Sequence, residues 1–173
     1  PTIHGLAADG LRYRGFLYSG IMVAVDGTPK VLEYNCRFGD PETQPILFRL
    51  KSDLLDLIEA ACHGGLGGQI AVWDSRAALG VVIAASGYPG DYPKGAEISL
   101  GHDTEDTKVF HAGTAMNGVQ PITSGGRVLC VTALGLSVTE AKTKAYERLK
   151  SVHFEGAEYR TDIGYRAVEH ERS

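Results

Sequence analysis

The stretch GFLYSGIMVAVDGTPKVLEYN, residues 15–35, contains two extended runs of residues on either side of a turn. Residues 15–25 are almost continuously apolar and aromatic, a pattern typical of a strand that is covered on both faces. Asp26-Gly27 supplies residues that tolerate a positive φ, and extended character resumes over residues 30–35. The stretch therefore predicts an antiparallel hairpin.

The second predicted strand carries polar side chains at alternate positions. Glu33 and Asn35 project from one face, about 7 Å apart along the backbone. A carboxylate and a carboxamide oxygen side by side suit a hard cation such as Mg²⁺, which completes its shell with phosphate oxygens and water. If the strand continues, Arg37 shares this face and its guanidinium could neutralise a phosphoryl group. The competing interpretation is that Glu33 and Asn35 form the solvated face of an ordinary strand.

A helical region follows the hairpin and ends at a cluster of glycines. Apolar residues from Ile46 to Ala61 follow a 3.6-residue repeat, and a break is expected near Ser52, which could cap a second helix. Gly64–Gly68 stops the helix, and a polar segment comes next. We therefore expect one domain over residues 1–68, a linker over 69–75 and a second domain over 76–173.

The second predicted domain mixes strands with a helix. Extended segments are expected at residues 79–86, 108–113 and 127–133. Ser137 and Glu140 have the spacing of a capping box and predict a helix that continues to about residue 149. Residues 159–169 could close the sheet as a last strand. This pattern indicates a small α+β domain.

Composition excludes several classes of protein. The chain has 173 residues, is 43% apolar and has a net charge of −4 without charged blocks, so nucleic acid is not an expected partner. No run approaches the roughly 20 apolar residues of a membrane span, and no signal pattern is present. The three cysteines show no CxxC spacing, which favours a reducing, cytoplasmic location over a disulfide framework or a zinc site. Cys36 should face away from Glu33 and Asn35 as a buried thiol.

The polar strand continues into EYNCRFGDPETQP, residues 33–45, and this string resembles the signature of the glycinamide ribonucleotide synthetase family. Other parts of the chain resemble that family in the same order: GFLYSGIMV, RLKSDLLDL, ALGVVIAASGYPGDYPKG, KVFHAGT, GGRVLCVTALG and YRTDIGYRA. The resemblance extends over essentially the whole chain.

The family belongs to the ATP-grasp enzymes, so the resemblance implies an α+β fold made of the C-terminal part of an ATP-grasp domain, with antiparallel strands and helices, followed by a small α+β domain. It implies that Glu33 and Asn35 bind Mg²⁺ or Mn²⁺ and thereby ATP, and that Arg37 acts on the transferred phosphate or the substrate.

The resemblance also suggests substrate-binding residues. Asp40 and Glu42 would lie near glycine or the amine of phosphoribosylamine, although each could instead have a purely local role, in a turn and in the first turn of a helix. Arg160 is a candidate for the ribose 5-phosphate, and a surface salt bridge is its alternative.

The activity that the resemblance implies is ATP-dependent joining of glycine to phosphoribosylamine. Catalysis would need the N-terminal part of the same enzyme as a partner, and the oligomeric state stays open. Two alternatives remain: another ATP-grasp ligase or carboxylase that shares the Glu-x-Asn-x-Arg string, and a non-catalytic scaffold that kept the fold.

Overall fold

The computed structural model of the chain describes residues 1–172 and divides into two compact units. Unit 1 contains Pro1–Asp40 and Leu50–Trp73, and unit 2 contains Pro41–Arg49 and the chain from Asp74 onward. The chain therefore passes from one unit to the other three times. The domain linker predicted at residues 69–75 stays a prediction. Residues 41–49, which precede it in the chain, belong to unit 2 and not to unit 1.

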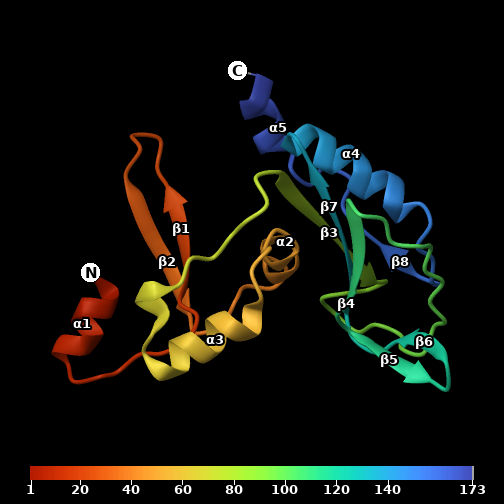
Figure 1. Cartoon of the computed structure of the whole chain (residues 1–173). Helices are drawn as coiled ribbons and strands as arrows, with labels where there is room; N and C mark the ends of the chain where they lie inside the picture. Colours follow the sequence, from red (N-terminus) through yellow and green to blue (C-terminus); the bar gives the residue numbers. More distant parts are fainter. Residues whose placement is uncertain (173) are drawn as a thin grey trace. The chain divides into compact units, whose positions relative to one another are not determined.

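Unit 1 is built around a hairpin (Figure 1). Its helices and strands are α1 (Thr2–Ala8), β1 (Tyr18–Val23), β2 (Pro29–Asn35), α3 (Leu54–His63) and a short 3-10 helix, η1 (Leu66–Gly68). Strands β1 and β2 pair antiparallel, with Tyr18 opposite Asn35, and Gly27 takes a φ of 82° in the turn. The predicted hairpin is confirmed.

The prediction that the first strand is covered on both faces is wrong for this chain. Ile21, Met22 and Val23 are 54%, 55% and 63% exposed, and Cys36, predicted to be buried, is exposed as well. A two-stranded sheet has no interior strand, and within residues 1–172 no further strand pairs with it. Apolar composition alone therefore did not determine burial here.

The predicted break in the helical region is present, but its cap is a different residue. The segment forms α2 (Thr43–Phe48) in unit 2 and α3 in unit 1. Asp53 caps α3 by accepting a 2.7 Å hydrogen bond from the Leu55 N–H, whereas the Ser52 hydroxyl accepts one from the Val72 N–H. As predicted, α3 ends at Gly64, which has a left-handed conformation.

Unit 2 is organised by a four-stranded antiparallel sheet in the order β4-β7-β3-β8 (Figure 1). Its strands are β3 (Ala77–Ala85), β4 (Thr107–His111), β7 (Arg127–Gly135) and β8 (Ala157–Glu158). A separate hairpin joins β5 (Thr114–Asn117) to β6 (Gln120–Thr123), and helices α4 (Val138–Leu149) and α5 (Tyr165–Arg172) complete the unit.

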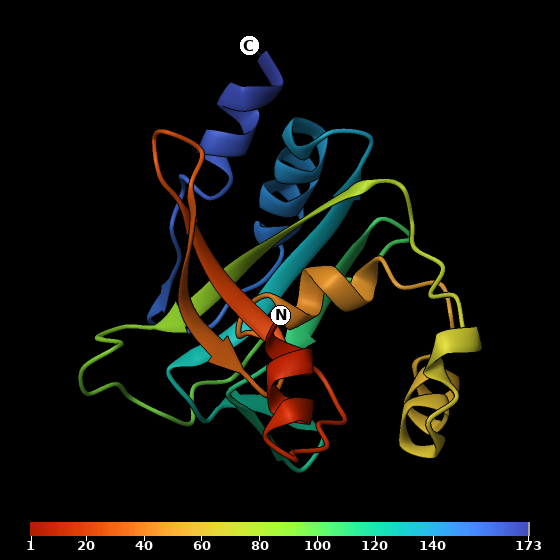
Figure 2. The same ribbon diagram turned by 90° about the vertical axis from the view of Figure 1, so that its left-hand side faces the viewer.

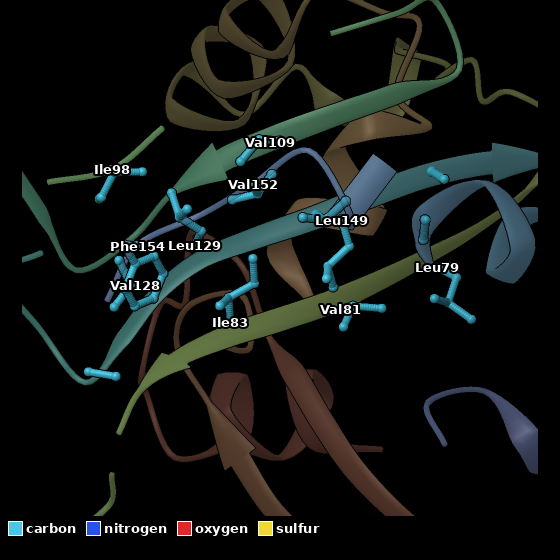
Figure 3. Close-up of a cluster of buried hydrophobic side chains, with 14 of the residues drawn as sticks. Leu79, Val81, Ile83, Ile98, Val109, Val128, Leu129, Leu149, Val152 and Phe154 are labelled. Carbon is cyan, nitrogen blue, oxygen red and sulfur yellow. The ribbon is translucent and has the colours of Figure 1, made fainter. Parts of the chain in front are cut away.

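Alternation along these strands places apolar residues on both faces of the sheet. One face packs against α4 and holds the main cluster of buried side chains, among them Val81, Ile83 and Leu129 (Figure 3). The other face packs against α2, where the Phe48 and Phe110 rings meet edge to face at 6.0 Å. Figure 2 shows α2 and α4 on opposite sides of the sheet.

The end of the chain differs from the prediction. The Ser137 hydroxyl caps α4 as expected, accepting from the Glu140 N–H at 3.1 Å, while Glu140 accepts from the Leu136 N–H. Residues 159–169 do not form a closing strand: β8 ends at Glu158, and α5 begins at Tyr165. Helix α5 packs on α4 and buries Val168. A helix brings residues three or four positions apart onto one face, which an extended segment does not do.

In the part of the chain that the structure describes, no helix has the length and apolarity to cross a bilayer.

Candidate functional site

Glu33 and Asn35 lie next to each other at the end of β2. The Asn35 side-chain amide donates a hydrogen bond of 3.0 Å to Glu33 Oε1, so both side chains project from one face of the strand. Glu33 is exposed and Asn35 is half-buried. The carboxylate and the amide carbonyl thus form a pair of oxygen ligands open to a cation and its other ligands.

Gly20 on β1 makes room for this pair. It lies opposite Glu33 in the hairpin, beside an irregularity in the register. A Cβ at position 20 would come within 3.1 Å of Glu33 Cγ, so any larger residue would press on the glutamate side chain. Sequence reasoning missed Gly20, although a glycine inside an apolar strand is a signal of close approach.

The donor set fits a hard divalent cation with few protein ligands. Mg²⁺ is commonly held by one or two protein oxygens while phosphate oxygens and water supply the remaining ligands. Across residues 1–172, no group of three or more His, Cys, Asp or Glu side chains could hold a metal. With two oxygen ligands, the Glu33 and Asn35 pair suits a cation that arrives with a phosphate ligand.

Arg37 does not share the strand with Glu33 and Asn35, because β2 ends at Asn35. Its Nη1 atom donates to the carbonyl oxygen of Phe38 at 2.9 Å, and the Phe38 ring lies 4.1 Å from that of Phe16. Arg37 was expected on the same face as Glu33 and Asn35 only if the strand continued to residue 37. The strand does not continue that far.

The next two candidates belong to different units. Asp40 is exposed and is the last residue of the first segment of unit 1. Glu42 is half-buried in unit 2 and precedes α2, to which its side chain gives no capping hydrogen bond. Glu42 therefore lies just before α2 and not in its first turn, which contains no acidic residue.

Arg160 lies at a pocket of about 520 Å³ within unit 2. Its guanidinium also pairs with Asp162 in a two-pronged contact, Nε to Oδ1 at 2.9 Å and Nη2 to Oδ2 at 2.6 Å. This contact lowers the pKa of the Asp162 carboxyl. The salt bridge and the pocket-lining position thus coexist, and the side chain remains 71% exposed.

The pocket combines cationic and aromatic walls along one face of β3. Its lining residues are Pro41, Gly80, Val82, Ala84, Tyr88, Arg127, Glu158, Tyr159, Arg160 and Ile163. The Arg127 guanidinium lies 6.0 Å from the Tyr88 ring centroid. Tyr88 can pack there because position 126 is glycine: a Cβ on Gly126 would come within 2.2 Å of the ring. Two guanidinium groups beside two phenol rings suit an anionic ligand with a ring or chain, and they outnumber the single carboxylate in the lining, that of Glu158.

Comparisons with known proteins agree over the whole chain. A model of the phosphoribosylglycinamide synthetase C domain matches residues 78–166, and one of the ATP-grasp (A) domain of the same synthetase matches residues 1–43. The phosphoribosylamine–glycine ligase of Vibrio cholerae is 55% identical in a match that covers 100% of this chain. The ligase of the same name from Haemophilus influenzae is 56% identical in a match that covers 99% of it.

The structure agrees with these sequence matches. The crystal structure of a phosphoribosylamine–glycine ligase from Thermotoga maritima superposes with a TM-score of 0.79 at 41% identity and covers 94% of this chain. The chain spans 41% and 40% of the two curated relatives and 40% of the solved one. Since the C-domain match alone covers more than half of its residues, the chain belongs to the phosphoribosylglycinamide synthetase family.

Proposed function

We propose that the polypeptide carrying this chain joins glycine to 5-phosphoribosylamine with ATP, giving glycinamide ribonucleotide, ADP and phosphate in purine synthesis. The relatives that match the whole chain bear the name of this ligase, which supports the proposal. We assign residues 1–68 to the last part of an ATP-grasp domain and 76–173 to the small C-terminal domain, with 69–75 as linker. We place the enzyme in the cytoplasm.

Glu33 and Asn35 would hold Mg²⁺ or Mn²⁺ together with the ATP phosphates. The observation that carries this assignment is the contact between the two side chains, which keeps both oxygen ligands on one face of β2. A bound divalent cation would neutralise charge on the phosphates as they transfer. The protein's own contribution is to fix the two ligands, and Gly20 leaves the space that the glutamate needs.

The remaining residues would act on the substrates. Glycine would be activated as glycyl phosphate, which the amine of phosphoribosylamine then attacks with release of phosphate. Arg37 would contact the phosphoryl group or the activated glycine, while Asp40 and Glu42 would bind glycine or the attacking amine. Arg160, at the pocket in unit 2, would bind the ribose 5-phosphate. These contributions are mainly positioning and charge neutralisation.

The central test is a pair of substitutions in the full-length polypeptide. We expect Glu33→Gln and Asn35→Ala to lower the Mg²⁺-dependent release of ADP by about a hundredfold or more, because several kcal/mol of charge stabilisation depend on the cation. Asn117→Ala, at the turn between β5 and β6, is the matched control and should keep its activity. Circular dichroism should show an unchanged fold in all three variants.

Retention of activity by either metal-site variant would contradict the assignment and favour a scaffold. Measuring ADP release with a panel of acids and amines separates this ligase from other ATP-grasp enzymes: only glycine with phosphoribosylamine should support turnover. The 173-residue chain alone is expected to release no phosphate from ATP under these conditions.

A further inference from the structure

One tyrosine hydroxyl fixes the loop that carries Arg160. Tyr146, on α4, donates a hydrogen bond of 2.6 Å to the backbone carbonyl of Arg160. The same hydroxyl oxygen accepts a bond of 3.2 Å from the N–H of Ile163. A single side chain therefore joins two points of the loop between β8 and α5, three residues apart.

The Tyr146 ring and its hydroxyl have separate roles. The ring packs against the buried apolar cluster of unit 2, so its position is set by the core. Burial, the largest influence, raises the pKa of the phenol, so the group stays protonated and remains a donor near neutral pH. The core therefore fixes the position of the ring, and the ring places the hydroxyl within hydrogen-bond distance of the loop backbone at Arg160 and Ile163.

Both ends of the bridged loop line the pocket. Arg160 and Ile163 are lining residues, and Asp162 between them holds the Arg160 guanidinium at two atoms. Because Asp162, on the same loop, holds the Arg160 guanidinium at two atoms, the position of the guanidinium follows the position of the loop. Loss of the bridge would let the loop, and with it the cationic wall of the pocket, move.

We propose that Tyr146 is a positioning residue for substrate binding, whose hydroxyl sets the Arg160 loop so that the guanidinium meets the phosphate end of a phosphorylated sugar in the pocket. The inference rests on the proposed function, in which Arg160 binds that phosphate. It predicts a selective effect on one of three substrates, which a residue that only supports the fold would not produce.

The test is Tyr146→Phe in the full-length polypeptide, since phenylalanine keeps the ring in the core and removes only the hydroxyl. We expect the KM for phosphoribosylamine and the inhibition constant of ribose 5-phosphate, used as the probe, to rise about tenfold, equal to about 1.4 kcal/mol. The KM values for ATP and glycine should stay within about twofold. Thermal unfolding is measured for each variant in parallel.

Two further variants separate the possible failures. Tyr165→Phe also removes a phenol oxygen, one that accepts a hydrogen bond from Arg166 Nε, and should change neither constant. Arg160→Gln should raise both; if it does not, the Arg160 assignment fails and the inference fails with it. If Arg160→Gln raises them and Tyr146→Phe does not, only the role of Tyr146 is overturned. An equal rise for all three substrates would also overturn it, because a general loss of structure has no substrate preference.

Discussion

The sheet of unit 1 and the sheet of unit 2 are both built from strands rich in apolar residues, yet only the second is covered. Strands β3 and β7 pack between α4 and α2, and β7 is buried along almost its whole length. Strands β1 and β2 are exposed at most positions, and none of their residues is buried. The candidate metal ligands lie on the exposed pair. Strand composition therefore predicts extended structure, whereas burial depends on the layers that other segments provide.

The sharpest test of this contrast is the same substitution in each sheet. Leu129 on β7 is fully buried, whereas Leu32 on β2 is 65% exposed. Leu129→Ala should lower the free energy of unfolding of unit 2 by about 3 kcal/mol, because it removes apolar contacts and leaves a cavity. Leu32→Ala should change stability by no more than about 0.5 kcal/mol. Urea unfolding of the 173-residue chain measures both.

Equal effects of the two substitutions would break the comparison. A large loss in Leu32→Ala would mean that unit 1 contains a cooperative core that the exposed strands do not suggest. A small loss in Leu129→Ala would mean that the sheet of unit 2 repacks around the missing side chain. Amide hydrogen exchange locates the change, since β7 amides should be the slower to exchange.

A second and smaller effect compares the helix caps of the two units. Ser137 caps α4 in unit 2, and Asp53 caps α3 in unit 1. Removal of either side chain should cost about 1 kcal/mol. Ser137→Ala should shift the unfolding transition of unit 2, because α4 covers the sheet.

Asp53→Ala should instead reduce the helix content of α3 and leave the unit 2 transition in place. Circular dichroism and hydrogen exchange on the same samples distinguish the two responses. A shift of the unit 2 transition in Asp53→Ala would show that the units unfold together, which would weaken the contrast.

Local signals in the sequence predicted the hairpin, the break before α3, the glycine stop and the start of α4. Each depends on residues close together in the chain: Asp26-Gly27 in the turn, Gly64 after α3 and Ser137 before α4. Such signals act through backbone conformation and short hydrogen bonds, so they can be read without tertiary context.

Features set by distant segments were missed. Residues 165–172 form α5, not a strand, and the small hairpin of β5 and β6 was not expected. The membership of α2 in unit 2 depends on contacts with β3 and β7, far along the chain. For the site, alternation placed Glu33 and Asn35 correctly on one face. The end of β2 before Arg37 and the anchoring of Arg160 by Tyr146 could not be inferred from spacing.

The smallest effect concerns charged groups in unit 2. Asp106 accepts hydrogen bonds from Lys144 at 2.8 Å and from Arg76 at 2.5 Å, and Arg76 also pairs with Asp74 at 2.8 Å. Both hydrogen bonds lower the pKa of Asp106 below its ordinary value, and the one from Lys144 has the larger influence. The network links the start of β3, the turn before β4 and α4.

A carboxyl group whose pKa is lower in the folded chain stabilises the fold above its unfolded pKa, and this stabilisation is lost as pH falls through the folded value. Asp106→Asn should therefore unfold at a lower urea concentration than the parent chain at pH 7. The two midpoints should converge as pH falls below about 4. Since these groups are partly exposed, the difference should also shrink at high salt.

The control is Glu105→Gln, which removes one negative charge from the neighbouring residue. If Glu105→Gln shifted the urea midpoint as much as Asp106→Asn does, net charge would set the pH dependence, and not the hydrogen bonds from Lys144 and Arg76 to Asp106.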